Sequence, residues 1–160
     1  MKTRDNSQPQ NIKPRIVVIG VGNLLMKDEG IGIHAIEQLE KIDLPPEIKL
    51  IDGGTSPDLI AYTRSGDKLV IIDAARAGGE PGAVYRLKPE DLTAEKQILN
   101  SAHEMGVIEA LRLMTFTGNK PADVVIIGVE PKEIDWGIEL SPELERKLPE
   151  IIDVILREIG

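Results

Sequence analysis

Apolar residues fall into two patterns along the chain, short runs and longer stretches with a helical period. The short runs are rich in β-branched residues, which is typical of strands buried on both faces of a parallel sheet. They occur at Ile16–Ile19, Ile48–Ile51, Leu69–Ile72 and Val124–Ile127. The segment Ala83–Leu87 alternates between apolar and polar residues and predicts a further strand, antiparallel and at an edge.

Between these strands, apolar residues recur at the spacing of amphipathic helices. After the first strand, one apolar face is formed by Ala35, Ile36 and Leu39. Asp28 precedes this face and is predicted to cap the helix, with the acidic pair Asp28-Glu29 at the positive end of the helix dipole. Ser56 and Pro57 predict the start of a second helix, with Ser56 as its cap, that ends near Arg64.

Two more helices are predicted in the second half of the chain. One spans His103–Met114, and the other starts at Ser141 and continues to the end. The buried stripe of this last helix is predicted to consist of Leu148, Ile151, Ile152, Ile155 and Ile159. Residues 88–99 fit either a short helix or a loop. Alternating strands and helices predict an α/β fold, with a mostly parallel sheet covered on both faces.

Composition limits the class of protein. The chain has 160 residues, which suits one α/β domain over 15–160 preceded by a flexible polar tail over 1–14. A net charge of −8 argues against broad contact with nucleic acid or a membrane surface, and it permits a basic partner. The absence of cysteine excludes disulfides and thiolate chemistry. There is no apolar segment of a signal peptide or a transmembrane helix, so a cytoplasmic location is expected.

Acidic residues follow three of the predicted strands. Glu29 comes after the first strand, Asp52 after the second and Asp73 after the third. In a parallel sheet these strand ends meet at one edge, where ligands bind in open α/β sheets. His103 opens the helix before the last central strand and could reach the same edge. Two carboxylates and an imidazole suit a divalent metal ion such as nickel, zinc or manganese.

Each of these residues also has an ordinary structural interpretation. Acids at strand ends commonly cap the next helix or accept hydrogen bonds from turn amides, and this fits Glu29, Asp52 and Asp73 as well as a ligand role does. A lone histidine such as His103 is more often a surface residue than a ligand. His34 lies within the first helix, where it points away from Glu29, and is predicted to be solvated.

A dinucleotide site is the main alternative that the residues themselves suggest. Gly20-Val21-Gly22 matches the start of the Gly-x-Gly-x-x-Gly motif, and Asp52 lies where a ribose-binding acid would follow. However, Leu25 occupies the third glycine position, and Asp28-Glu29 would repel a phosphate at the helix start. The sequence also lacks a phosphate-binding P-loop and the Gly-x-Ser-x-Gly motif of serine hydrolases.

The strand ends and two later segments carry a specific combination of motifs. These are Gly20-Val21-Gly22-Asn23, Asp28-Glu29-Gly30-Ile31-Gly32, Asp52-Gly53-Gly54-Thr55, Ile71-Ile72-Asp73-Ala74, Ser101-Ala102-His103-Glu104-Met105-Gly106, Gly128-Val129-Glu130-Pro131 and Gly137-Ile138-Glu139-Leu140-Ser141. Together they resemble the [NiFe]-hydrogenase maturation endopeptidases, which trim the precursor of the hydrogenase large subunit. The resemblance extends from Ile16 to Ile159.

This resemblance implies both a fold and a site. The fold is three-layer α/β/α with a twisted, mostly parallel five-stranded sheet of the phosphorylase/hydrolase-like type. The nickel-binding residues are implied to be Glu29, Asp73 and His103, and the catalytic residues Asp52, Glu29 and Asp73. The substrate carries the nickel, so no tightly bound cofactor of the enzyme's own is expected. Members of the family act after nickel insertion, and they remove a short C-terminal extension beyond the last Cys-x-x-Cys motif of the precursor.

We therefore expect an aspartic-type endopeptidase whose partner is the [NiFe]-hydrogenase large-subunit precursor, and which acts as a monomer or weak homo-oligomer. The side chains of Glu29, Asp73 and His103 are expected to be exposed and to converge on one cleft. Two alternatives stay open. One is a metal- or precursor-binding chaperone without hydrolysis, and the other is a nucleotide-binding α/β enzyme.

Overall fold

A computed structural model describes residues 14–55, 58–92, 98–99 and 101–160, and for 101–105 only the helical backbone. The predicted tail over 1–14 therefore lies almost entirely outside the described residues. The strands are β1 (Ile16–Val21), β2 (Ile48–Gly54), β3 (Lys68–Ala74), β4 (Val84–Leu87) and β5 (Asp123–Val129). The helices are α1 (Ile31–Glu40), α2 (Leu59–Tyr62), α3 (Ser101–Thr117) and α4 (Pro142–Ile159), with short 3₁₀ helices η1 (Lys27–Gly30) and η2 (Pro89–Asp91).

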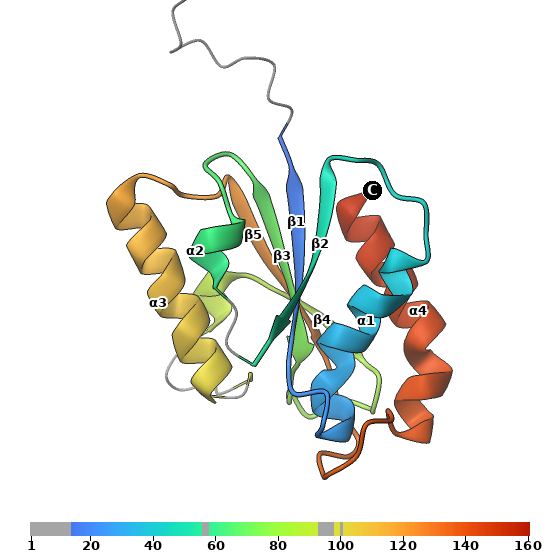
Figure 1. Cartoon of the computed structure of the whole chain (residues 1–160). Coiled ribbons are helices and arrows are strands. Elements are labelled where there is room, and N and C mark those ends of the chain that lie inside the picture. Colours follow the sequence, from blue (N-terminus) through green and yellow to red (C-terminus); the bar gives the residue numbers. More distant parts are fainter. Residues whose placement is uncertain (1–13, 56–57, 93–97, 100) are drawn as a thin grey trace, which may run out of the picture.

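The strands form one five-stranded sheet in the order β2-β1-β3-β5-β4. All neighbours are parallel except the antiparallel pair of β4 and β5. Helices α1 and α4 cover one face of the sheet and α2 and α3 cover the other, which gives three layers (Figure 1). The predicted α/β/α fold with an antiparallel edge strand is thus confirmed. The four parallel strands end at a common carboxyl edge, where α1 and α3 begin (Figure 1).

Aliphatic side chains fill the space between the sheet and each layer of helices. On one side Ile36 of α1 and Ile152 of α4 pack against alternate residues of the strands. On the other side, Leu59 of α2 and Val107 and Met114 of α3 do the same. Every residue of the predicted stripe on α4 is buried. Because the strands are apolar on both faces, the sheet is held rigidly between the helices, and this fixes the positions of the strand ends.

Two of the predicted helix starts are wrong. Asp28 caps no helix, because it lies in η1, and α1 begins only after Gly30, which has no side chain to cap with. The second helix, α2, begins at Leu59 with Asp58 as its cap, and it is only four residues long. Ser56 and Pro57, which were expected to open it, lie outside the described residues.

The remaining helix predictions concern the second half of the chain. The oxygen of the Ser141 hydroxyl accepts a hydrogen bond from the Leu144 N–H, which confirms Ser141 as the cap of α4. The ambiguous segment over 88–99 begins with η2, and its residues 93–97 lie outside the described ranges. Within the part of the chain that the structure describes, none of the helices has the length and apolarity needed to cross a bilayer.

Candidate active site at the carboxyl edge of the sheet

The loop that carries Glu29 leaves β1 and folds tightly back onto the sheet. Gly22 has a φ of 147°, and a side chain at this position would collide with the backbone of Glu29. In the first turn of α1, Gly32 lies so close to the carbonyl oxygens of Val21 and Ile72 that a Cβ would not fit. These glycines therefore serve the close approach of backbones at the end of β1.

The backbone N–H groups of this loop are already bonded within the protein. The N–H of Lys27 donates to the Gly137 carbonyl at 2.8 Å, and the N–H of Asp28 donates to the Glu133 carbonyl at 3.1 Å. The N–H of Glu29 donates to the carbonyl of Met26 within the same loop. A phosphate site needs free amides at this position, so the geometry disfavours the dinucleotide alternative.

Asp28 joins this loop to the chain that follows β5. Its buried carboxylate accepts hydrogen bonds from the N–H groups of Lys132 at 2.9 Å, Glu133 at 2.8 Å and Ser141 at 2.7 Å. The hydroxyl of Ser141 donates a fourth bond, also at 2.7 Å. Charge-assisted hydrogen bonds of this kind are stronger than neutral ones, so Asp28 fixes the loop before the turn that carries Glu29.

Lys27 holds a backbone conformation that is uncommon for a residue other than glycine. Its φ is 47°, in the left-handed region. Its ammonium group lies 2.7 Å from the Glu133 carboxylate, and this hydrogen bond and charge raise the pKa of Lys27. The N–H of Gly137 donates to the Leu25 carbonyl at 2.9 Å, next to the parallel bridge between Met26 and Gly137. The surrounding contacts thus maintain the local strain.

The two loops joined by this bridge expose large apolar side chains. Leu25 is 55% exposed, Trp136 is 75% exposed and Ile138 is 65% exposed. They belong to two segments that are hydrogen-bonded to each other beside η1. Exposed apolar patches of this type are typical of protein contact surfaces.

Asp73 lies at the carboxyl end of β3, opposite Gly128 of β5. Its side chain is 1% exposed, and its Oδ1 accepts a hydrogen bond from the Ala74 N–H at 2.8 Å. The expectation that the Asp73 side chain is exposed is therefore wrong, and its role as a ligand stays a prediction. Since side chains alternate along a strand, Asp73 shares the face of Leu69 and Ile71, which is the face that α3 covers.

Glu29 and His103 belong to elements that reach the same edge. η1 lies against β3, and the half-buried Glu29 carboxylate has no hydrogen bond or ion pair with the described residues. The end of α3 that begins at Ser101 lies at the carboxyl edge in Figure 1. The side chain of His103 lies outside the described residues, and those described form no group of three acids or histidines that could hold a metal. Convergence of Glu29, Asp73 and His103 stays a prediction.

Asp52 occupies a different part of this edge. It is exposed at the end of β2, and its Oδ1 accepts a hydrogen bond from the Gly54 N–H at 3.0 Å. Strand alternation places it on the face of Ile48 and Leu50, which pack with α1. Asp52 and Asp73 therefore share the edge but lie on opposite faces of the sheet, so the structure does not bring all the predicted acids together.

Comparison with known proteins decides the family. Residues 33–158 match the family model described as hydrogenase maturation protease. The hydrogenase 2 maturation protease of Escherichia coli K12 is 34% identical over 152 residues, covering 91% of this chain and 93% of the relative. The hydrogenase expression/formation protein HupD of Thiocapsa roseopersicina is 36% identical over 154 residues, covering 92% and 68%. The chain belongs to the hydrogenase maturation protease family.

Solved structures agree with this assignment. The hydrogenase maturating endopeptidase HybD from Escherichia coli superposes with a TM-score of 0.79 at 32% identity, covering 91% of this chain and 94% of that one. HybD from Thermococcus kodakarensis gives a TM-score of 0.72 at 29% identity, covering 91% and 99%. The protease is thus a peptide hydrolase of hydrogenase maturation, and the chaperone and nucleotide-binding alternatives are set aside.

A further strand-end acid of the protease, Glu130, shapes the loop after β3. It is 8% exposed, and its carboxylate accepts hydrogen bonds from the N–H groups of Ala77 at 2.8 Å and Gly78 at 3.1 Å. The Tyr85 hydroxyl donates to Glu130 at 3.3 Å and accepts from the Gly79 N–H at 3.0 Å. Burial, with the nearby charge of Glu130, raises the pKa of Tyr85. An acid directly after a buried strand is the signal that could have identified this residue.

The prediction that His34 is solvated is wrong. Its side chain is only 19% exposed, and its Nδ1 lies 3.9 Å from the Glu37 carboxylate. Its Nε2 is buried and has no hydrogen-bond partner among the described residues. The difference arises because the flank of α1 on which His34 lies is partly covered in the folded chain.

Proposed function

We propose that the protease removes the C-terminal extension from the nickel-loaded precursor of a [NiFe]-hydrogenase large subunit. In this proposal Glu29, Asp73 and His103 recognise the nickel. The observation that carries the proposal is the placement of η1 against the carboxyl end of β3, which brings the turn of Glu29 to the strand end of Asp73. The carboxylate of Glu29 has no partner among the described residues, so it is free to bind an incoming ion. Carboxylates and imidazole are suitable ligands for nickel.

The nickel belongs to the substrate, and the precursor leaves one side of its coordination shell open. Glu29, Asp73 and His103 would complete that shell, so that binding reports the presence of the metal. Nickel held in this way polarises the scissile carbonyl or lowers the pKa of a bound water. A precursor without nickel lacks these contacts, so it is bound weakly and is not cut.

Asp52 is proposed to act on the peptide rather than on the metal. Its Oδ1 is held by the Gly54 N–H, and its Oδ2 has no partner among the described residues. An exposed carboxylate at this edge can accept a proton from an attacking water. The protease would then be an aspartic-type endopeptidase in which Glu29 and Asp73 act beside the metal. All of these residues belong to one chain, so a monomer or weak homo-oligomer is sufficient.

Glu29→Gln is the most informative variant, because it keeps the size and helix propensity of the residue and removes its charge. Purified enzyme is incubated with nickel-loaded or nickel-free precursor, and the products are measured by mass spectrometry. We expect the wild type to cut only the loaded form, and Glu29→Gln to lose both cleavage and capture of it. Glu145→Gln on the exposed side of α4 is the matched control and should remain active.

Two further variants extend this test to the other ligands. Asp73→Asn keeps an oxygen for the Ala74 N–H, and it should abolish cleavage without unfolding the protein. His103→Ala should do the same. Wild-type rates in Glu29→Gln, or equal cleavage of loaded and nickel-free precursor, would contradict recognition of nickel through this site. Capture of the precursor without a smaller product would contradict hydrolysis.

A further inference from the structure

The outer edge of β2 is a strand edge with which no described element pairs. β2 stands first in the sheet order, so only the side that faces β1 is hydrogen-bonded. The N–H of Ile16 donates to the Glu47 carbonyl at 3.0 Å, and in a parallel ladder this register turns the backbone groups of Lys49 toward β1. The N–H and C=O groups of the next residue, Leu50, therefore point away from the sheet.

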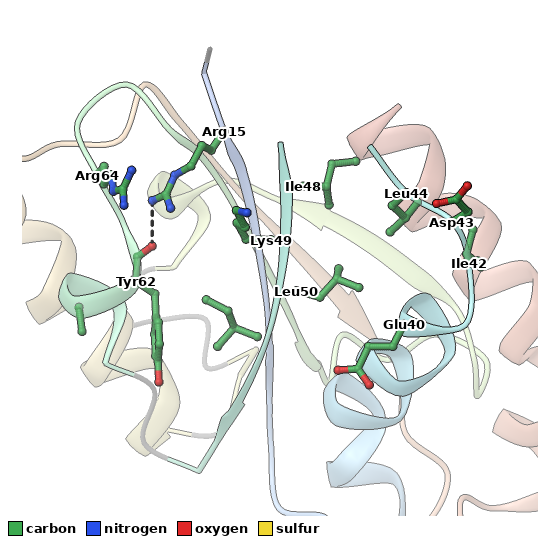
Figure 2. A pocket seen from close by; sticks show the side chains of 12 residues that line it. Arg15, Glu40, Ile42, Asp43, Leu44, Ile48, Lys49, Leu50, Tyr62 and Arg64 are labelled. Atoms are coloured by element: carbon green, nitrogen blue, oxygen red, sulfur yellow. Dashed lines mark hydrogen bonds between the residues drawn. The ribbon is translucent and has the colours of Figure 1, made fainter. Parts of the chain in front are cut away.

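This edge forms the floor of a groove of about 620 Å³. One wall contains the apolar side chains of Ile42 and Leu44, and of Ile48 and Leu50 of β2. The other wall carries Tyr62 of α2 (Figure 2). Ile42 is 39% exposed and Tyr62 is 42% exposed. A free strand edge with side-chain pockets beside it is a common arrangement for binding an extended peptide as an added strand.

Positive charge gathers at the end of the groove where β2 begins. Arg15, Lys49 and Arg64 line this end, while the acids Glu40 and Asp43 belong to the opposite wall (Figure 2). Arg15 is engaged in an ion pair. Lys49 and Arg64 are exposed, and their side chains have no ion pair within the described part of the chain. In a protein of net charge −8, two such cations indicate a site for a carboxylate.

We propose that this groove binds the C-terminal extension of the precursor as an added strand, antiparallel to β2. This inference rests on the function proposed above, in which the cut bond lies at the carboxyl edge of the sheet. The extension follows that bond in sequence, so it must run from the carboxyl edge toward the start of β2. There Lys49 and Arg64 bind a carboxylate, which comes from an acidic side chain or from the chain terminus. The direction of the added strand and the position of the positive charge therefore both favour this orientation of the extension.

The dimensions of β2 define the bound segment. The strand has seven residues, and at about 3.3 Å per residue its edge pairs with roughly 20 Å of extended chain. The carboxylate should therefore follow the cut bond by about five to seven residues. Alternate side chains of the segment face the wall of Ile42 and Leu44, and these side chains should be apolar.

Hydrogen exchange at the Leu50 amide tests the pairing directly. The probe is a synthetic peptide with the sequence of the extension, added to the full-length enzyme. We expect the Leu50 amide to exchange rapidly in the free enzyme and at least about tenfold more slowly with saturating peptide. The Lys49 amide, which already faces β1, should change little. Unchanged exchange at Leu50 would overturn the proposal. Protection of Leu50 before peptide is added, together with a dimer in sedimentation, would assign the edge to a second copy instead.

Charge reversal tests the cationic end. The double variant Lys49→Glu with Arg64→Glu should raise the Kd for the peptide about tenfold at low salt, and the difference should shrink at high salt. The matched control, Arg112→Glu with Arg146→Glu on α3 and α4, should leave the Kd unchanged. If the chain terminus supplies the carboxylate, amidation of the peptide terminus should weaken binding as the charge reversal does. If acidic side chains supply it, their replacement by neutral residues should do so. If neither change weakens binding of the peptide, the assignment of this end of the groove to a carboxylate is wrong.

Cleavage kinetics separate this inference from the function on which it rests. Glu29→Gln should bind the peptide with the wild-type Kd while failing to cut the loaded precursor. The double charge reversal should raise KM about tenfold and leave kcat near the wild-type value. Unchanged KM and peptide affinity in that variant would refute the groove and leave the proposed function intact. Equal cleavage of loaded and nickel-free precursor would refute nickel recognition. The hydrogen exchange of Leu50 would still show whether the groove binds the peptide.

Discussion

Replacing Asp28 by alanine should destabilise the protease by about 3–5 kcal/mol. The Asp28 carboxylate is completely buried and accepts four hydrogen bonds, of which three come from backbone N–H groups. Each hydrogen bond to a charged group contributes about 1.5–3 kcal/mol, but the four are not additive because they share one acceptor group. We therefore take the value typical of removing one side of a buried charged contact, which leaves fixed donors without an acceptor.

Asp28→Asn refines this prediction, because it preserves the volume. Oδ2 accepts three of the four bonds, and Oδ1 accepts only the bond from the Ser141 N–H. An asparagine can turn its carbonyl toward the three donors, but its NH₂ group then faces the Ser141 N–H, so two donors oppose each other. The expected loss is about 2–3 kcal/mol, less than for alanine. Asp43→Asn, at an exposed position, should change stability by less than about 0.5 kcal/mol.

Urea unfolding followed by far-UV circular dichroism measures these differences. For a chain of this length, a loss of 3–5 kcal/mol corresponds to a fall in Tm of about 6–20 °C. The order of stability should be wild type, then Asp28→Asn, then Asp28→Ala. If alanine costs less than about 1 kcal/mol, then the contacts of Asp28 do not hold the two loops together.

The other predictions concern packing and pH. Gly32→Ala should destabilise the protein by about 2 kcal/mol or more, because a Cβ there would collide with backbone. Gly106→Ala, where a Cβ meets open space, should stabilise it by about 0.5–1 kcal/mol. Equal changes in Tm for the two variants would contradict this. Ile152→Ala should cost about 2–5 kcal/mol through the cavity it leaves, so an unchanged unfolding midpoint would argue against its packing. The pKa of Glu158 is lowered, chiefly by its hydrogen bond with Arg86, so its contribution is present above pH 4.5 and is lost as the pH falls through the lowered pKa. Glu158→Gln should therefore flatten the loss of stability in acid, as measured by urea unfolding at several pH values.

The layered fold was predictable because its signals are local. The run Ile16–Ile19 and its counterparts are apolar on both faces, and only a strand covered on both sides buries such a run. The stripe on α4 follows from helical periodicity in the same way, and Ser141 is a cap that acts on its own helix. Each of these features depends on residues within a few positions of one another, so a single sequence contains the necessary information.

The contacts around the site were not predictable in this way, because they join distant segments. Asp28 was expected to cap the next helix, but its hydrogen-bond partners lie 104 to 113 residues further along the chain. Glu130 depends on Tyr85 and on a loop after a different strand. The burial of Asp73 depends on what packs over its face of the sheet. In each case the residue type indicated a carboxylate at a strand end, and only the assembled sheet determines which donors it meets.

The exposed loop beside the site also gives the protease an optical property. Trp136 is the only tryptophan of the chain, and it is 75% exposed next to the bridge between Met26 and Gly137. Its indole is already surrounded largely by water in the folded state, so unfolding of the core should change its fluorescence little. A protein that docks on this edge would cover the indole and shift its emission to shorter wavelengths. The intrinsic tryptophan fluorescence would therefore respond to a protein that docks on this edge, and it would respond little to unfolding of the core.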